Sequence, residues 1–141
     1  MAEPRGKRLL EGSDAILGIE QTDGSCEAEA FIQKQPKQVQ ARYKRYLERL
    51  RDGLPVKNPE HMRPLDSDSL GNEMHELKNH SPSATRLYIM KLGTPTNGTK
   101  WIATHGGPKP KKVETEIKNT WTKFYNWLDG ERQSDVCIPE V

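Results

Sequence analysis

No stretch of this 141-residue sequence stays apolar for the roughly 18 to 20 residues that a helix needs to cross a bilayer. The longest apolar run covers only residues 87–90, which excludes a membrane-spanning helix. The charged N-terminus is not followed by the apolar core of a secretory signal, so we expect a cytoplasmic protein. Internal repeats and low-complexity tracts are also absent from the sequence.

Cysteine is scarce, and the residues that could bind a metal are not spaced as ligands. Cys26 and Cys137 are the two cysteines, and without CxxC spacing they indicate neither a zinc site nor a redox motif. The four histidines do not form a ligand pattern, and HExxH is absent. We therefore expect two reduced thiols, no metal and no cofactor.

The composition is polar for a globular protein, with 33% hydrophobic and 30% charged residues. A chain of this length suits one domain, because two separate cores would each be too small to offset the entropy lost on ordering. We therefore predict a single domain over residues 15–130, between flexible tails at residues 1–14 and 131–141.

Hydrophobic periodicity predicts an α+β fold. The first half contains a short strand at residues 15–19 and two helices, at residues 25–35 and 36–53. Gly53 supplies the left-handed residue that ends the second helix. The pattern then changes to three strands and a last helix. These elements are expected at residues 73–78, 86–92, 101–105 and 113–130.

Short loops rich in turn formers separate the three later strands, so we expect them to pair antiparallel. Residues 87–90 are apolar at both alternating positions, which indicates a central strand covered on both faces. The predicted fold is a small antiparallel sheet of about four strands with two N-terminal helices and one C-terminal helix.

The net charge of +2 conceals a basic segment at residues 100–112 that contains no acid. Its basic residues are Lys100, His105, Lys109, Lys111 and Lys112. Such a segment is typical of a polyanion contact, although a solvated loop has the same composition. The helix around Lys37–Arg51 also has a basic face, for which solvation is a simpler explanation than a partner surface.

Short motifs follow one another in a defined order along the chain. They are Met62-Arg63-Pro64-Leu65, Leu70-Gly71-Asn72-Glu73-Met74-His75-Glu76-Leu77-Lys78, Arg86-Leu87-Tyr88, Thr104-His105-Gly106 and the lysines before Glu114-Thr115-Glu116-Ile117. In order and spacing they resemble the RelE/HigB superfamily of toxin–antitoxin ribonucleases, in particular its phage-derived HigB-like branch. The resemblance covers residues 15–128 and implies a RelE-like fold.

The sequence departs from the family pattern in places. Lys78 stands where the family commonly has arginine, and Gly107-Pro108 follows the His-Gly pair in place of an aromatic and a basic residue. The stretch before the last helix is about two residues short. These departures affect the roles of site residues more than the fold.

The resemblance implies a toxin that cuts messenger RNA without a metal, by driving the ribose 2′-hydroxyl onto the adjacent phosphate. It also implies that the ribosome presents the messenger RNA and that a cognate antitoxin protein is a partner. The reaction needs a base for the hydroxyl, cations for the charge that grows on the phosphate, and an acid for the departing oxygen.

Arg86 is the first candidate for this site, because a guanidinium group can hold two phosphate oxygens through parallel hydrogen bonds. The alternative for Arg86 is an ion pair with Glu73 or Glu76. Lys78, at the end of the preceding strand, would add positive charge beside it.

His75 and His105 are the candidates for proton transfer, because imidazole titrates near neutral pH. Taken singly, each is more simply explained as a packed or surface histidine. Other basic residues are candidates for gripping RNA phosphate. These are Arg63, Lys109, Lys111 and Lys112.

Other functions fit the same features. A ParE-like inhibitor of DNA gyrase, or a non-catalytic phage-derived binding protein, would keep the fold without cutting RNA. An adaptor that binds a partner through the basic face of Lys37–Arg51 is a further alternative.

Overall fold

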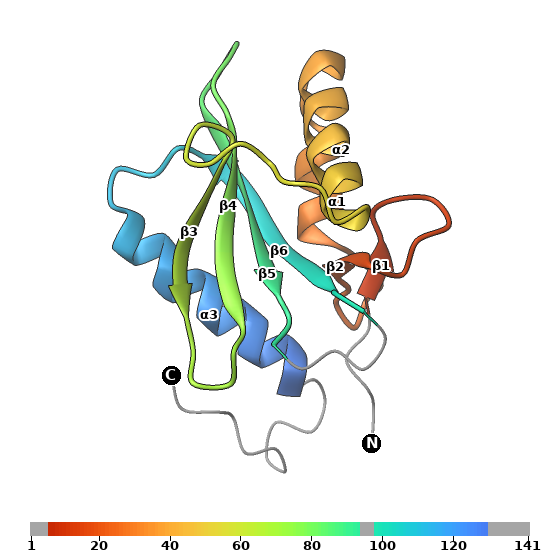
Figure 1. Cartoon of the computed structure of the whole chain (residues 1–141), viewed down its shortest axis with the longest axis vertical. Coiled ribbons are helices and arrows are strands. Elements are labelled where there is room, and N and C mark those ends of the chain that lie inside the picture. The colour runs from red at the N-terminus through yellow and green to blue at the C-terminus, as the bar shows by residue number, and fades with distance from the viewer. Residues whose placement is uncertain (1–5, 94–97, 130–141) are drawn as a thin grey trace.

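The computed structural model describes residues 6–93 and 98–129, which form a six-stranded mixed sheet with helices on both faces (Figure 1). The strands are β1 (Gly6–Arg8), β2 (Ile16–Ile19), β3 (Met62–Ser67), β4 (Glu73–Asn79), β5 (Thr85–Lys91) and β6 (Trp101–Pro108). The helices are α1 (Glu27–Gln33), α2 (Lys37–Arg51) and α3 (Val113–Asp129). The strand order across the sheet is β1-β2-β6-β5-β4-β3.

The strands β4, β5 and β6 are consecutive antiparallel neighbours, as predicted. Residues 87–90 of β5 are all buried, and helices cover the sheet on both sides (Figure 1). The prediction of a central strand covered on both faces is therefore confirmed.

Alternation along the strands divides the apolar side chains between two cores. Leu87 and Ile89 of β5 pack on the side of α1 and α2, in a cluster with Tyr43. Met90 packs on the side of α3, with Phe124. Fully burying a side chain of this size stabilises the fold by about 1.5 to 3 kcal/mol.

Within the described residues, neither Cys26 before α1 nor Pro36 before α2 makes a side-chain capping hydrogen bond, and the helices differ in the charges of their first turns. Gly53, with a φ of 72°, follows α2 and takes the left-handed conformation predicted for it. Both α1 and α3 carry two glutamates in the first turn, where acids complement the helix dipole. In contrast, α2 has no acid in its first turn and begins with Lys37.

The predicted sheet of about four antiparallel strands is wrong. The sheet has six strands, and β2 pairs with β6 in parallel, with Ile16 opposite Trp101. The RelE-like antiparallel arrangement expected from the motifs is therefore replaced by a mixed sheet. Whether two strands pair parallel or antiparallel depends on the path of the chain between them. Residues 15–19 alone therefore could not predict the parallel pairing.

Two strands were missed because they lack an alternating pattern. β1 has three residues and lies within the segment predicted as a tail, yet it pairs with β2, and Leu10 after it is buried. β3 contains Pro64 and a register shift at Leu65, which an edge strand tolerates. The predicted tail at residues 131–141 lies outside the described residues. None of the helices in the described ranges is long and apolar enough to cross a membrane.

Candidate functional site

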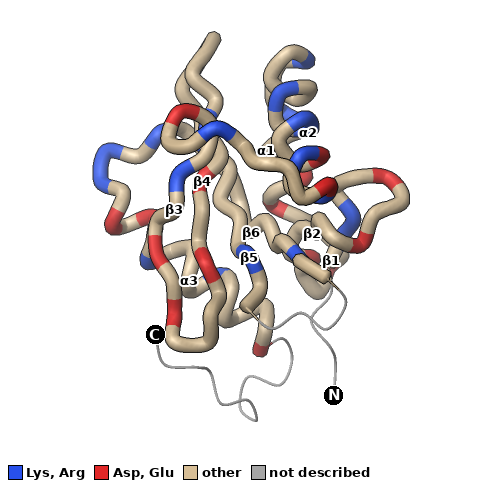
Figure 2. The backbone as a smooth tube through the Cα atoms, in the orientation of Figure 1, with Lys and Arg blue, Asp and Glu red and all other residues tan. Residues whose placement is uncertain are grey.

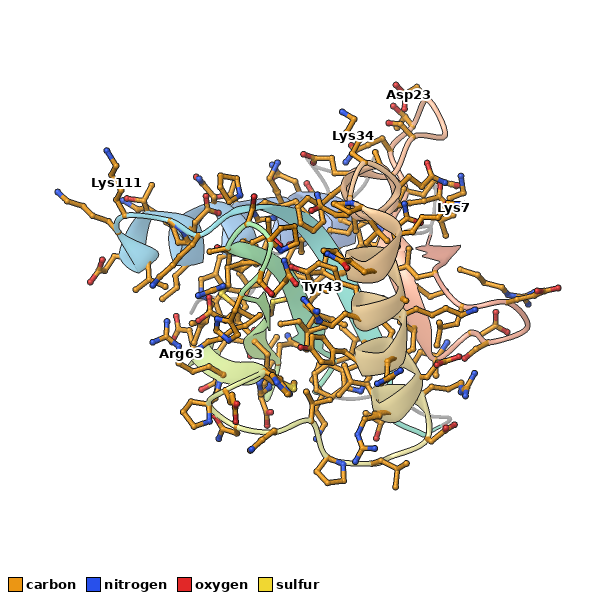
Figure 3. All side chains as sticks on the ribbon, turned by 90° about the horizontal axis from the view of Figure 1, so that it is seen from above. Lys7, Asp23, Lys34, Tyr43, Arg63 and Lys111 are labelled. Atoms are coloured by element: carbon orange, nitrogen blue, oxygen red, sulfur yellow. The ribbon has the colours of Figure 1, made fainter. Side chains whose placement is uncertain are left out.

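A hollow of ≈ 760 Å³ lies where the end of β4 and the start of β5 meet the loop before α3. Its basic lining residues are Arg63, Lys78, Arg86, Lys109, Lys111 and Lys112. Glu76 and Glu114 supply carboxylates to the same lining. We call this site the cationic hollow. Figure 3 shows Arg63 and Lys111 on the side of the molecule away from Lys7.

Strand register places the central side chains of the cationic hollow. Lys78 of β4 lies directly opposite Arg86 of β5, and Arg63 of β3 lies opposite Glu76 of β4. Because alternate residues of a strand share a face, Glu76 and Lys78 point to the same side of the sheet. This is the side that α3 covers, since Met74 two residues earlier packs in the α3 core.

Glu76 connects the two arginines of the cationic hollow. Its side chain is 2% exposed, and its Oε2 lies 2.8 Å from Nη2 of Arg63. Its Oε1 lies 3.5 Å from Nε of Arg86. Arg86 Nη1 also donates to the carbonyl oxygen of Thr85 at 2.9 Å. The ion pair considered as the alternative for Arg86 is thus present, and a buried carboxylate needs such partners.

The ammonium group of Lys78 has a pKa below the ordinary value of a lysine. Burial lowers the pKa of its ammonium group most, and the nearby charges of Arg63, Arg86 and Lys109 lower the pKa further. Glu76 acts in the opposite direction. Lys78 therefore gives up its proton more readily than a solvated lysine.

His105 lies beside the cationic hollow but does not line it. Its Nε2 is 2.9 Å from Oε2 of Glu116 in α3, and its Nδ1 is 2.9 Å from Oγ1 of Thr104. Its ring stacks on Tyr88 with 4.8 Å between the ring centroids. The Tyr88 hydroxyl is buried and has no hydrogen-bond partner within residues 6–93 and 98–129. His105 is thus held in place by three neighbours.

His75 is not brought together with Arg86. It packs edge-on against Trp101, with 5.4 Å between the ring centroids, in a second hollow on the other face of the sheet. Its Nε2 is 3.1 Å from Oε1 of Glu73. Burial lowers the pKa of the imidazole, and Glu73 partly opposes this effect.

Six of the eight predicted site residues therefore meet in the cationic hollow, while His105 lies next to it and His75 faces away. Sequence reasoning treated Glu76 only as an ion-pair partner of Arg86 and did not place it in the site. Its place could have been predicted, because Glu76 stands two residues before Lys78 on one predicted strand and so shares its face of the sheet.

The described part of the chain contains no group of three or more histidine, cysteine or acidic residues placed to hold a metal ion. In comparisons with known proteins, no protein family, no curated protein and no solved structure matches the chain. The residues of the hollow themselves are therefore the evidence for its chemistry. What the hollow offers is a concentration of guanidinium and ammonium groups suited to a phosphate anion.

Proposed function

We propose that the cationic hollow binds a backbone phosphate of RNA and that the chain cleaves the RNA there without a metal. The observation that carries this proposal is the convergence of six basic side chains on one hollow, from three strands and the loop before α3. The motifs that resemble RelE/HigB toxins favour messenger RNA on the ribosome as the substrate. They also favour a cytoplasmic toxin that is neutralised by a cognate antitoxin.

The arginines are suited to hold the phosphate. A guanidinium group donates two parallel hydrogen bonds to phosphate oxygens, and Glu76 fixes the position of Arg86 before the substrate arrives. Preorganised cations stabilise the negative charge that grows on the phosphate in the transition state. The lysines around the rim add further positive charge.

Lys78 is the group we assign as base. In its neutral form it accepts the proton of the ribose 2′-hydroxyl, and its lowered pKa makes this form more accessible. The 2′-oxygen then bonds to phosphorus while the bond to the 5′-oxygen breaks. The products are a 2′,3′-cyclic phosphate and a 5′-hydroxyl end, whose proton comes from a lining ammonium group. His105 would serve as this acid only after its bond to Glu116 opens.

The test is cleavage of an end-labelled RNA by the purified chain in the presence of a metal chelator. The expected products carry cyclic phosphate and 5′-hydroxyl ends. Lys78→Gln should lower the cleavage rate by about 100-fold or more, the size of a general-base contribution. Lys100→Gln is a matched control, because it removes one charge at the far end of β5, where the Leu92 amide donates to the Lys100 carbonyl oxygen. Cleavage at the wild-type rate by Lys78→Gln would remove Lys78 as the base.

A binding protein that does not cleave is the second candidate, and the positions of the histidines favour it. His105 is engaged by Glu116, and His75 lies on the other face of the sheet. Such a protein would act as a ParE-like gyrase inhibitor or as a non-catalytic phage-derived binding protein. Primer extension on a reporter messenger after brief induction separates the two, because new messenger ends appear only if RNA is cut.

A further inference from the structure

The helix α2 carries six basic residues and a single acid, Glu48. The basic residues are Lys37, Arg42, Lys44, Arg45, Arg49 and Arg51. Its first turn has no acid, whereas α1 and α3 each have two glutamates there. The charge pattern of α2 thus differs from that of the other helices.

Two features of this pattern weaken the helix, although Arg49 and Arg51 in the last turn complement the negative end of its dipole. A cation at the first position, Lys37, is repelled by the positive end of the helix dipole. Arg45 and Arg49 are four residues apart, a spacing at which like charges repel. If the face served only to keep the helix soluble, acids placed three or four residues from the arginines and lysines would do so and would also stabilise the helix. The basic face of α2 is therefore better explained by an anionic partner than by solvation.

Outside α2 and residues 109–112, six of the eleven described lysines and arginines form ion pairs with acids. The pairs with N···O distances of 3.0 Å or less include Lys7–Glu29, Arg8–Asp14, Lys57–Glu60 and Arg63–Glu76. Within the described residues, Lys37, Lys44 and Arg45 of α2 form no ion pair, and neither do the lysines at residues 109–112. Nine of the thirteen described lysines and arginines without an ion pair thus lie on α2 or at the cationic hollow, and the other four are Lys34, Lys91, Lys100 and Lys118.

The turn between β4 and β5, at residues 80–84, joins these two regions. On one side, Arg42 Nη1 donates to the carbonyl oxygen of Ser81 at 2.8 Å. On the other side, the Lys109 amide donates to the carbonyl oxygen of Ala84 at 3.0 Å. Figure 2 shows the blue segments of α2 and of the loop before α3 in the upper half of the molecule, and red segments along the lower parts of β3 and β4.

One side of α2 carries three arginines, of which Arg42 contacts this turn. Arg42, Arg45 and Arg49 are three and four residues apart and so share one side of the helix. Arg42 is held by the turn, and Arg49 Nε donates to the carbonyl oxygen of Pro55 at 2.7 Å. Arg45 lies between them and is exposed. We call these residues the arginine stripe.

We propose that the arginine stripe extends the RNA-binding surface of the cationic hollow, so that the strand held in the hollow continues over the β4–β5 turn onto α2. The substrate class is then an RNA longer than the nucleotides that fill the hollow. This inference rests on the proposed function for the identity of the anion. RNA is favoured over an acidic protein because guanidinium groups match phosphate oxygens and because the unpaired cations continue on both sides of the turn.

The experiment compares Arg45→Gln with wild type in binding a labelled RNA of about 20 nucleotides and a dinucleotide, across a salt series. Arg45→Gln should bind the longer RNA several-fold more weakly and lower the slope of log affinity against log salt by about 0.7, the value for one contact to single-stranded phosphate. Binding of the dinucleotide should not change. Arg45→Lys should retain most of the affinity, and Lys100→Gln serves as the control for lost charge.

Each outcome has a distinct meaning. Unchanged binding of the longer RNA by Arg45→Gln overturns the role of the stripe and leaves the hollow as an RNA site. Failure of the wild-type chain to bind either RNA overturns the proposed function as well. Loss of binding to polyglutamate, with RNA binding intact, would assign the stripe to an acidic protein and so overturn the inference. Thermal unfolding of each variant checks that the fold is retained.

Discussion

The buried carboxylate of Glu76 lies 3.5 Å from Nε of Arg86 on the neighbouring strand. The pair lies at the base of the cationic hollow, where an anion would compete with Glu76 for the same guanidinium group. Arg86 therefore acts in the stability of the fold as well as in the proposed phosphate site. Any experiment on Arg86 has to separate these two effects.

Replacing Arg86 with glutamine should lower the free energy of unfolding by about 3 kcal/mol, because one partner of a buried ion pair is removed. Urea denaturation measures the loss. Arg63→Gln should cost less, since the side chain of Arg63 is 43% exposed. The double variant Glu76→Leu/Arg86→Met should recover most of the stability, because no charge is then left buried without its partner. A double variant as unstable as Arg86→Gln alone would contradict this explanation.

Gly106 and Gly107 are adjacent but should respond differently to a methyl group. A Cβ at Gly106 would lie 2.2 Å from Cδ2 of Phe31 in α1, whereas a Cβ at Gly107 would meet nothing within 4 Å. Gly106→Ala should therefore cost about 2 kcal/mol of unfolding free energy through overpacking. Gly107→Ala should change the stability by about 0.5 kcal/mol or less. Equal urea midpoints for the two variants would show that Phe31 moves aside freely.

His75 should make stability depend on pH on the acid side of neutrality. Burial holds its pKa below the ordinary value of 6.5, with Glu73 opposing the shift and Lys91 adding to it. Between these two pKa values the unfolded chain binds more protons than the folded chain, so stability falls as the pH is lowered. Urea midpoints at pH 7.5 and pH 5 should therefore differ less in His75→Gln than in the wild type. His80→Gln, which removes an exposed imidazole just after β4, is the matched control variant.

Tyr125 should contribute to stability without affecting the cationic hollow. Its hydroxyl donates to Oδ2 of Asp68 at 2.7 Å, and neither residue lines the hollow. Tyr125→Phe should lower the free energy of unfolding by about 1 kcal/mol, the net value of one such hydrogen bond. RNA binding should stay at the wild-type level. Weaker RNA binding by the folded variant would mean that the site extends further than the hollow and the arginine stripe.

Sequence periodicity predicted the elements whose own side chains build the cores. Apolar spacing placed α2 and α3, and the run at residues 87–90 identified the central strand. The edge strands β1 and β3 were missed, because β1 is too short for a pattern and Pro64 interrupts β3. The parallel pairing of β2 with β6 depends on the whole intervening chain, which no local window contains.

Lys109, Lys111 and Lys112 of the cationic hollow were predictable because they lie close together in the sequence, and Arg63, Lys78 and Arg86 were found through the motifs. His75 lies three residues before Lys78 on β4, and alternation alone puts the two on opposite faces. His105 is subtler. The strand register skips Thr104, so His105 faces Tyr88 and α3 instead of sharing the face of Ala103. The hydrophobic pattern of the sequence does not reveal a register shift of this kind.

The position of β2 beside β6 has a consequence for folding. Ile16 and Trp101 come from distant parts of the chain, so β6 gains its second neighbour only after a long loop has closed, which is a slow step. Until then the outer edge of β6 presents free backbone donors and acceptors that could pair with another molecule. Deleting the residues up to Ile19 would make that state permanent, and the chain should then aggregate.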